Sequence, residues 1–153
     1  AFILLVTCVA TSAPAQPAPS APDNPFFKEW TTPFGAPPFG EIKSEHFLPA
    51  FKEAAAQQRR AVEAIAASAE PPTFANTVEA LERSAPLLDK VGPVFSNLSS
   101  AETNDALQAI NREVAPMLSA LRDDIRLNPA LLKVLIAPTG HPPPKIRTNA
   151  LAR

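Results

Sequence analysis

The sequence lacks the residue sets from which most catalytic and metal sites are built. It contains a single cysteine, Cys8, so no internal disulfide can form. Its two histidines, His46 and His141, lie far apart, and no His/Cys group has the spacing of metal ligands. No HExxH, GxSxG, P-loop or GxGxxG string occurs. These absences predict that the chain has no catalytic, cofactor-binding or metal-binding residues of its own.

The sequence also lacks an excess of charge and the pattern of a sheet. Its formal net charge is −1, which gives no electrostatic footprint for nucleic acid or for an anionic membrane surface. No run of alternating apolar and polar residues is long enough to predict strands. The length of 153 residues is typical of one domain, and the 46% of hydrophobic residues is enough to form a core.

The first fifteen residues have the pattern of a processing signal. Residues 1–10 form an apolar run too short to span a bilayer, and residues 13–15 read APA, an A-x-A cleavage pattern. We therefore expect residues 1–15 to be the remnant of a secretory signal peptide whose basic start and initiating Met are missing. A buried apolar strand is one alternative. Another is lipid anchoring at Cys8, because residues 5–8 faintly resemble a lipobox. Both export routes predict a periplasmic location, with no stable membrane span after signal cleavage.

Residues 16–43 are predicted to form an extended leader rich in proline and aromatic residues. Pro33, Pro37 and Pro38 each bias the preceding residue toward extended backbone. A disordered linker would not usually carry as many aromatic side chains as this one does, namely Phe26, Phe27, Trp30, Phe34 and Phe39. We expect the leader to wrap against a folded body and bury these rings. The alternative is a platform on which a ligand stacks.

Residues 44–136 are predicted to form helices. In the first, over about residues 45–68, apolar side chains recur at steps of three and four, with Ser44 as the cap and Pro71 and Pro72 as the stop. A second stripe, in phase from Phe74 to Leu98, begins after Thr73, a good N-cap.

Pro86 and Pro93 interrupt this second stripe. Each can cost about 3 kcal/mol in a helix interior. The unbroken phase predicts one kinked helix, or two pieces hinged near Gly92 and Pro93.

A third stripe predicts a helix over about residues 103–127, bent at Pro116. Asn128 and Pro129 then have the pattern of a cap and a first helical residue, which predicts a short helix to about Ile136. Short connections make neighbouring helices antiparallel. The predicted fold class is all-α, a kinked antiparallel helical hairpin or small bundle.

Few polar residues in the helical region are candidates for a catalytic or metal-binding role. His46 lies near Glu41 and Glu45 and could serve as a base or a metal ligand, but a structural role at the start of a helix is favoured. Most charged positions fall off the apolar stripes and are expected to be solvated. Arg122 is expected to pair weakly with Glu113 or Asp124.

Ordered sequence blocks resemble the bacterial peptidyl-dipeptidases of the M3, or thimet oligopeptidase, family. Residues 30–39 (WTTPFGAPPF) resemble the leader of these enzymes, and residues 70–77 (EPPTFANT) are similar to their PPTFENT element. Further blocks match in order at residues 46–51, 80–84, 94–98, 107–116 and 127–131. The resemblance covers about residues 24–135 and does not separate the peptidyl-dipeptidase branch from the oligopeptidase A branch securely.

The resemblance implies a large, mostly helical zinc metallopeptidase that acts on short peptides and releases dipeptides from their C-termini. Its HExxH helix would supply two His ligands and a general-base Glu. Those residues lie far beyond position 153 in a full-length member, so the expectation is an N-terminal, non-catalytic portion that binds no zinc itself. Zinc belongs to the full-length family member.

The sequence departs from the family pattern in several places. Ala75 stands where the family often has Glu, and Asn111 stands where an acidic residue is common. The match ends after Leu135, and the Pro-rich tail of residues 137–153 suggests a frameshift or a truncated gene. Apolar stripes left without a partner would favour association. The alternative function is a secreted helical binding module without enzymatic activity.

Overall fold

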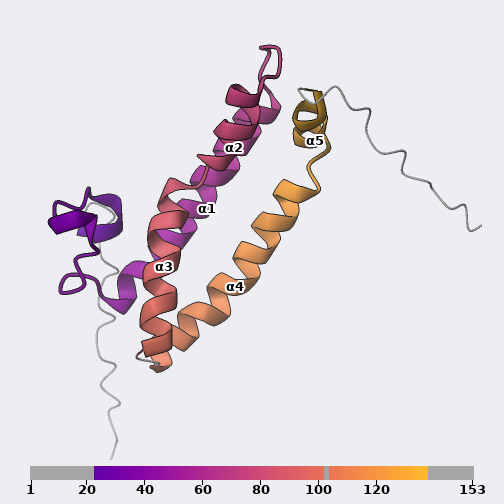
Figure 1. Ribbon diagram of the computed structural model, residues 1–153. Coiled ribbons are helices and arrows are strands. Elements are labelled where there is room, and N and C mark those ends of the chain that lie inside the picture. Colours follow the sequence, from indigo (N-terminus) through magenta and orange to yellow (C-terminus); the bar gives the residue numbers. More distant parts are fainter. Residues whose placement is uncertain (1–22, 102–103, 138–153) are drawn as a thin grey trace, which may run out of the picture.

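The computed structural model describes residues 23–101 and 104–137. The predicted signal remnant, Cys8, His141 and the predicted tail after Ala137 lie outside these residues. The described part is helical and contains no strand, which confirms the all-α fold class. Its long helices run alternately up and down, so sequential neighbours are antiparallel as expected (Figure 1).

Helix α1 (Ser44–Ala66) is the central element. Its N-cap is Lys43, which has extended backbone angles, and Ser44 is the first helical residue, so the prediction of Ser44 as the cap is wrong. The ring nitrogen Nδ1 of His46 accepts a hydrogen bond from the Lys43 backbone N–H at 3.0 Å. A side chain inside the first turn therefore satisfies the backbone group that a capping hydroxyl was expected to satisfy.

The second stripe forms separate pieces rather than one kinked helix. A π-helical turn η4 (Phe74–Glu79) leads into the short helix α2 (Ala80–Glu82), and helix α3 (Pro86–Ala101) starts afresh after a turn. The break lies at residues 83–85, and α3 continues through Gly92 and Pro93, so the predicted hinge at Gly92 and Pro93 is wrong.

The physical reason for this break is where each proline falls. Pro86 disfavours a helical residue before it, while its own fixed φ suits the first position of a new helix. Pro93 is exposed in the middle of α3, where Val91, Val94 and Phe95 are buried. Their burial offsets the backbone hydrogen bond that Pro93 removes.

Helix α4 (Asp105–Arg126) and helix α5 (Pro129–Ile136) follow the predicted pattern. The side chain of Asn104 caps α4 by accepting the Leu107 N–H, and Asn128 caps α5 by accepting the N–H groups of Ala130 and Leu131. Helix α4 passes through Pro116 without ending. Leu107, Val114 and Leu121 of the predicted stripe are buried.

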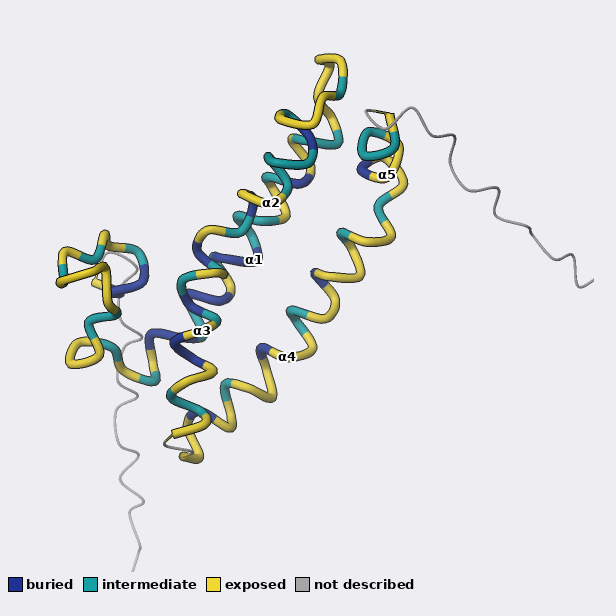
Figure 2. The backbone as a smooth tube through the Cα atoms, in the orientation of Figure 1, coloured by how far each residue is buried: buried dark blue, intermediate teal, exposed yellow. Residues whose placement is uncertain are grey.

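The core lies between α1 and its neighbours. Helix α1 packs against α3, α4 and α5, and buried residues gather where α1 faces α3 (Figure 2). A hydrophobic cluster joins these helices to the leader; its buried members are Phe26, Phe47, Ala50, Phe51, Ala54, Leu87, Val91, Val94, Phe95, Leu107 and Val114. The central helix therefore buries side chains on more than one face, which one apolar stripe would not predict.

The leader docks on the helices through only part of its length. The 3₁₀ turn η2 (Pro25–Phe27) places Phe26 in the core with 1% of its surface exposed. Phe27 and Trp30 are half-buried, whereas Phe34 and Phe39 are exposed. The second turn, η3 (Pro33–Gly35), has no buried residue. The expectation that the leader buries its rings is thus correct for Phe26, partly correct for Phe27 and Trp30, and wrong for Phe34 and Phe39.

Candidate functional site

A groove of about 750 Å³ lies where the leader meets α1 and the start of α3. Its lining combines apolar side chains with polar and charged ones: Phe26, Phe27, Pro49, Lys52, Glu53, Gln57, Pro86, Leu87 and Lys90. This volume falls in the range of small-molecule and peptide sites. The groove lining contains no Ser, Cys or Thr nucleophile and no histidine, so it offers a surface for contact and supplies no nucleophile–base pair.

An aromatic cluster shares Phe26 with this groove. The ring of Phe26 lies 5.2 Å from that of Phe47 and 6.2 Å from that of Trp30, centroid to centroid. Phe95 of α3 meets Phe47 at 5.1 Å and Phe51 at 5.4 Å in edge-on geometry. Such tilted and edge-on pairs are the favoured arrangements of aromatic rings. The cluster therefore holds the leader, α1 and α3 together at one place.

Lys90 of α3 connects the helices to the leader backbone. Its Nζ donates hydrogen bonds to the carbonyl oxygens of Phe26, at 3.2 Å, and Lys28, at 2.5 Å. The same nitrogen lies 4.3 Å from the ring centroid of Trp30, a cation–π geometry. Partial burial lowers the pKa of Lys90 below that of an ordinary lysine, and the nearby charge of Glu29 opposes this effect. Lys90 is thus a partly desolvated cation held by carbonyl groups and a ring.

Two buried polar residues, His46 and Asn24, fix the start of α1. His46 is 7% exposed and, as described above, accepts the Lys43 N–H. Asn24 of the leader is 1% exposed, and its Nδ2 donates to the backbone oxygen of His46 at 2.8 Å. The observed contacts of His46 are structural, as favoured from the sequence, and they join the leader to the helix.

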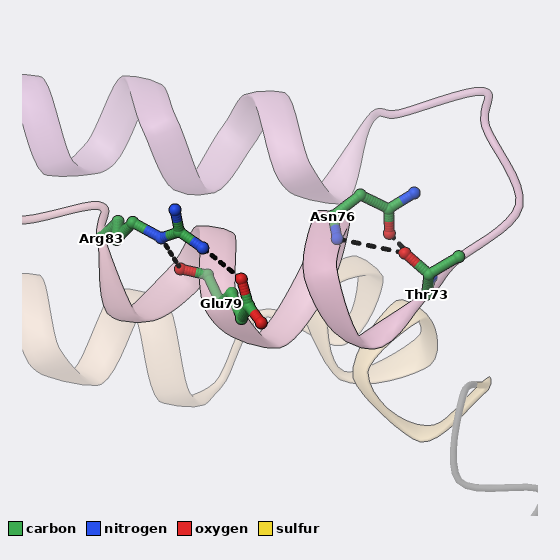
Figure 3. A network of polar contacts seen from close by, with 4 residues as sticks. All are labelled: Thr73, Asn76, Glu79 and Arg83. Carbon is green, nitrogen blue, oxygen red and sulfur yellow. Dashed lines mark hydrogen bonds and ion pairs between the residues drawn. The ribbon is translucent and has the colours of Figure 1, made fainter.

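A polar network orders the turn before η4 (Figure 3). The Asn76 side-chain oxygen accepts the Thr73 N–H at 2.7 Å, and the Thr73 hydroxyl oxygen accepts the Asn76 N–H at 3.1 Å. The Asn76 amide also donates to the carbonyl oxygen of Pro71 at 3.0 Å. The predicted N-cap at Thr73 is therefore confirmed, and Asn76 completes a reciprocal capping box.

The ion pairs differ from those expected. Glu113 of α4 pairs with Lys52 of α1 at 2.8 Å, and Asp124 of α4 pairs with Arg59 of α1 at 2.8 Å. The expected pairing of Arg122 with Glu113 or Asp124 is wrong, because both carboxylates face α1 and find cations there. These pairs join helices far apart in sequence, so neighbour spacing along one helix does not predict them.

Two further pairs join residues that are close in the sequence. Arg83 pairs with Glu79 one helical turn away (Figure 3), and Arg60 pairs with Glu53 at 3.0 Å. A hydrogen bond from Gln57 and a second from Arg60 lower the pKa of the Glu53 carboxyl below its ordinary value. All four charged side chains remain well exposed, so these contacts contribute little to stability.

The described residues do not fit a zinc site. Across residues 23–101 and 104–137, no group of three or more His, Cys, Asp or Glu side chains could hold a metal ion. The single histidine of this part is engaged at the start of α1 through its Nδ1. Within the same residues, no helix combines the length and apolarity needed to cross a bilayer.

Sequence reasoning missed Lys90, Asn24 and Asn76. Asn76 could have been found, because Thr73 and Asn76 have the three-residue spacing of a capping box. Lys90 and Asn24 act on backbone carbonyls more than twenty residues away, as the contacts to Phe26 and His46 show. Such contacts leave no local sequence pattern.

The sequence of this chain is similar to parts of longer bacterial peptidases. Over 105 residues, 69% of this chain, the sequence is 42% identical to dipeptidyl carboxypeptidase of Escherichia coli strain K12. It is 43% identical over 108 residues, 71% of this chain, to dipeptidyl carboxypeptidase of Salmonella typhimurium strain LT2. It is 33% identical over 88 residues, 58% of this chain, to oligopeptidase A of the same Salmonella strain. No protein-family model matches the chain.

These relatives confirm the resemblance drawn from the sequence blocks: the chain is homologous to a part of these peptidases of the M3 family. The matched stretches span only 15% and 16% of the two dipeptidyl carboxypeptidases and 13% of oligopeptidase A. The chain thus covers about one sixth or less of the length of each relative.

Proposed function

We propose that this chain is a non-catalytic helical portion of an M3-type zinc metallopeptidase that releases dipeptides from the C-termini of short peptides. The observation that supports this most is the 42–43% identity to two dipeptidyl carboxypeptidases over about 70% of the chain. The lower identity of 33%, over a shorter stretch, to oligopeptidase A favours the dipeptidyl carboxypeptidase branch.

The geometry of the groove is consistent with a structural wall of a peptide-binding space rather than with a reaction centre. The groove beside the leader presents apolar and aromatic side chains, and its charged groups are engaged in contacts within the chain. In the longer protein, zinc would polarise the scissile carbonyl and activate water. The residues described here would form helical structure around the space in which peptides bind.

A segment exchange tests this proposal. The aligned stretch of the Escherichia coli dipeptidyl carboxypeptidase would be replaced by the matching residues of this chain, and release of a C-terminal dipeptide from an N-blocked peptide would be measured. We expect the zinc-loaded chimaera to retain dipeptide release. A chimaera that folds with the thermal stability of the parent enzyme and releases no dipeptide would contradict the proposal.

The non-catalytic role has a separate test. The chain alone would be incubated with zinc and the same peptide, and we expect no hydrolysis. Zinc-dependent turnover by the chain alone would show that it holds its own reaction centre.

We further propose export to the periplasm, on the basis of the apolar run and A-x-A pattern in residues 1–15. Fractionation of a bacterium that expresses the complete gene tests this. Recovery of the mature protein in the periplasmic fraction is expected, and recovery only in the cytoplasm, with residues 1–15 still attached, would contradict it.

A secreted binding module without enzymatic activity is the second candidate. The observation that favours it is the exposure of large apolar side chains outside the groove: Phe34, Phe39, Phe74, Leu127 and Leu132. In the segment exchange, a folded but inactive chimaera would favour this binding module over the peptidase proposal.

A further inference from the structure

The segment of residues 23–30, here named the leader strap, is attached to the helices by a small set of contacts. Phe26 inserts into the aromatic cluster, and Asn24 donates to the backbone oxygen of His46. Lys90 supplies the contacts from α3, through the carbonyl oxygens of Phe26 and Lys28. The attachment therefore consists of one buried ring, one buried amide, one cation and the partly buried rings of Phe27 and Trp30, which pack against the core.

The strap is also a local unit in its own hydrogen bonding. The N–H groups of Phe27 and Lys28 donate to the carbonyl oxygens of Asn24 and Pro25, and the Trp30 indole N–H donates to Pro25 at 3.0 Å. After Trp30, the chain is mostly exposed as far as the start of α1. A segment with its own internal hydrogen bonds, followed by an exposed connection, can open as a local unit without unfolding the helices, at the cost of exposing Phe26.

Lys90 is placed to control this detachment. Its ammonium group bridges two strap carbonyls and lies over the Trp30 ring, so it contacts the strap at three points. Among the described residues no carboxylate forms an ion pair with Lys90, and the charge of Glu29, itself in the strap, attracts it from farther away. Loss of the cation would leave two carbonyls and a ring without their partner, while the helices would keep their own contacts.

We propose that the leader strap opens and closes on α1 and α3 independently of the helical body, and that the Lys90 ammonium group is the latch that holds it closed. The closed strap completes the 750 Å³ groove, because Phe26 and Phe27 form one of its walls. Opening removes that wall and uncovers Phe47 in the aromatic cluster. The latch thus decides whether the groove exists, and this inference does not depend on the proposed peptidase function.

The chain carries its own reporter for this motion, since Trp30 is its only tryptophan. Quenching of Trp30 fluorescence by acrylamide would be measured in the full chain and in Lys90→Met, Lys90→Arg and Lys52→Met variants. Lys90→Met keeps apolar bulk and removes the cation. Lys52→Met is the matched control, because Lys52 lines the same groove but pairs with Glu113 of α4.

We expect Lys90→Met to raise the quenching constant toward that of the urea-unfolded chain, with helical circular dichroism unchanged. Cleavage by chymotrypsin after Phe27 and Trp30 should accelerate about tenfold, the effect of losing hydrogen bonds from one charged donor. Lys90→Arg should stay near the wild type, since a guanidinium can donate to carbonyls and stack on an indole. Lys52→Met should behave as the wild type does.

Three results would overturn the proposal. The first is a Lys90→Met protein with wild-type quenching and cleavage. The second is a Lys90→Arg protein whose Trp30 is as exposed as in Lys90→Met. The third needs no variant: in a urea titration of the wild-type chain, Trp30 exposure and helix loss would follow one identical transition. Independent opening predicts that Trp30 becomes exposed at lower urea than the helices unfold.

Discussion

Single polar side chains in this protein satisfy backbone groups where helices begin. His46 does this for α1, Thr73 and Asn76 for η4, Asn104 for α4 and Asn128 for α5. The first N–H groups of a helix have no partner inside it, so a side chain or water must supply one. The residues that look most chemically capable in the sequence are thus used to start helices and to join segments.

Replacement of Thr73 tests the capping network at its centre. Thr73→Ala removes the oxygen that accepts the Asn76 N–H, and we expect the free energy of unfolding to fall by about 1 kcal/mol. Thr73→Ser keeps the oxygen and should stay close to the wild type. Urea unfolding followed by circular dichroism measures both. Equal losses in the two variants would show that the methyl group, rather than the hydrogen bond, stabilises this turn.

The Glu53 carboxyl offers a residue-scale test by titration. Its pKa is lowered chiefly by the hydrogen bond from Gln57 and then by Arg60, so the folded state favours the ionised form. The stability that this provides is present above the ordinary glutamate pKa and is lost as the pH falls through the lower, folded value. NMR titration should give a Glu53 midpoint below that of an exposed glutamate. In Gln57→Leu the midpoint should rise, and an unchanged midpoint would contradict the assigned cause.

Helical elements in this chain are divided by the positions of proline relative to buried side chains. Pro86 follows the break at residues 83–85 and starts α3, whereas Pro93 lies on the exposed side of α3 and is tolerated. The cost of a proline in a helix is similar at each site. The difference lies in the burial of Val91, Val94 and Phe95 around Pro93, which holds α3 together across it.

Gly92 gives a prediction at the scale of this element. It lies inside α3 with no positive φ, and a Cβ built on it meets no atom within 4 Å. Gly92→Ala should therefore raise the free energy of unfolding by about 0.5–1 kcal/mol, because alanine restricts the unfolded chain and favours helix. Gly35→Ala is the matched contrast. Gly35 has φ of 65°, which alanine adopts only with strain, so this variant should lower the free energy of unfolding. Thermal unfolding of both variants decides, and a loss of stability in Gly92→Ala would contradict the α3 backbone described here.

In the whole molecule, α1 is the central helix, and α2, α3, α4 and α5 pack against it. Helix α4 joins it through the buried stripe that ends at Leu121 and through the exposed Lys52–Glu113 and Arg59–Asp124 pairs. Exposed pairs of this kind contribute at most about 1 kcal/mol each, whereas burial of a leucine contributes several times more. The apolar seam therefore determines the attachment of α4.

Leu121 tests this attachment. Leu121→Ala should lower the free energy of unfolding by about 2–5 kcal/mol, because it removes a side chain that is only 2% exposed. Leu127→Ala is the control, since Leu127 is 79% exposed and should change stability little. Urea titrations at low and high salt complete the test, and salt should shift the wild-type curve less than Leu121→Ala does. A larger effect of salt would assign the attachment to the ion pairs.

The sequence by itself determined the all-α class, the approximate bounds of α1, α4 and α5, and the family relationship. These properties depend on local information: apolar periodicity, Asn and Pro at helix starts, and ordered blocks that can be matched without coordinates. For the same reason Asn128 and Thr73 were predicted correctly as caps.

Only the tertiary structure decided where the second stripe breaks, which leader rings are buried and which charges pair. Each of these depends on contacts between segments far apart in the chain, such as Lys90 with Phe26, Lys52 with Glu113 and Phe26 with Phe47. The energies involved are set by burial and by geometry between elements, which a linear pattern does not contain. The groove beside the leader exists for that reason alone: its walls come from three separate segments that the fold brings together.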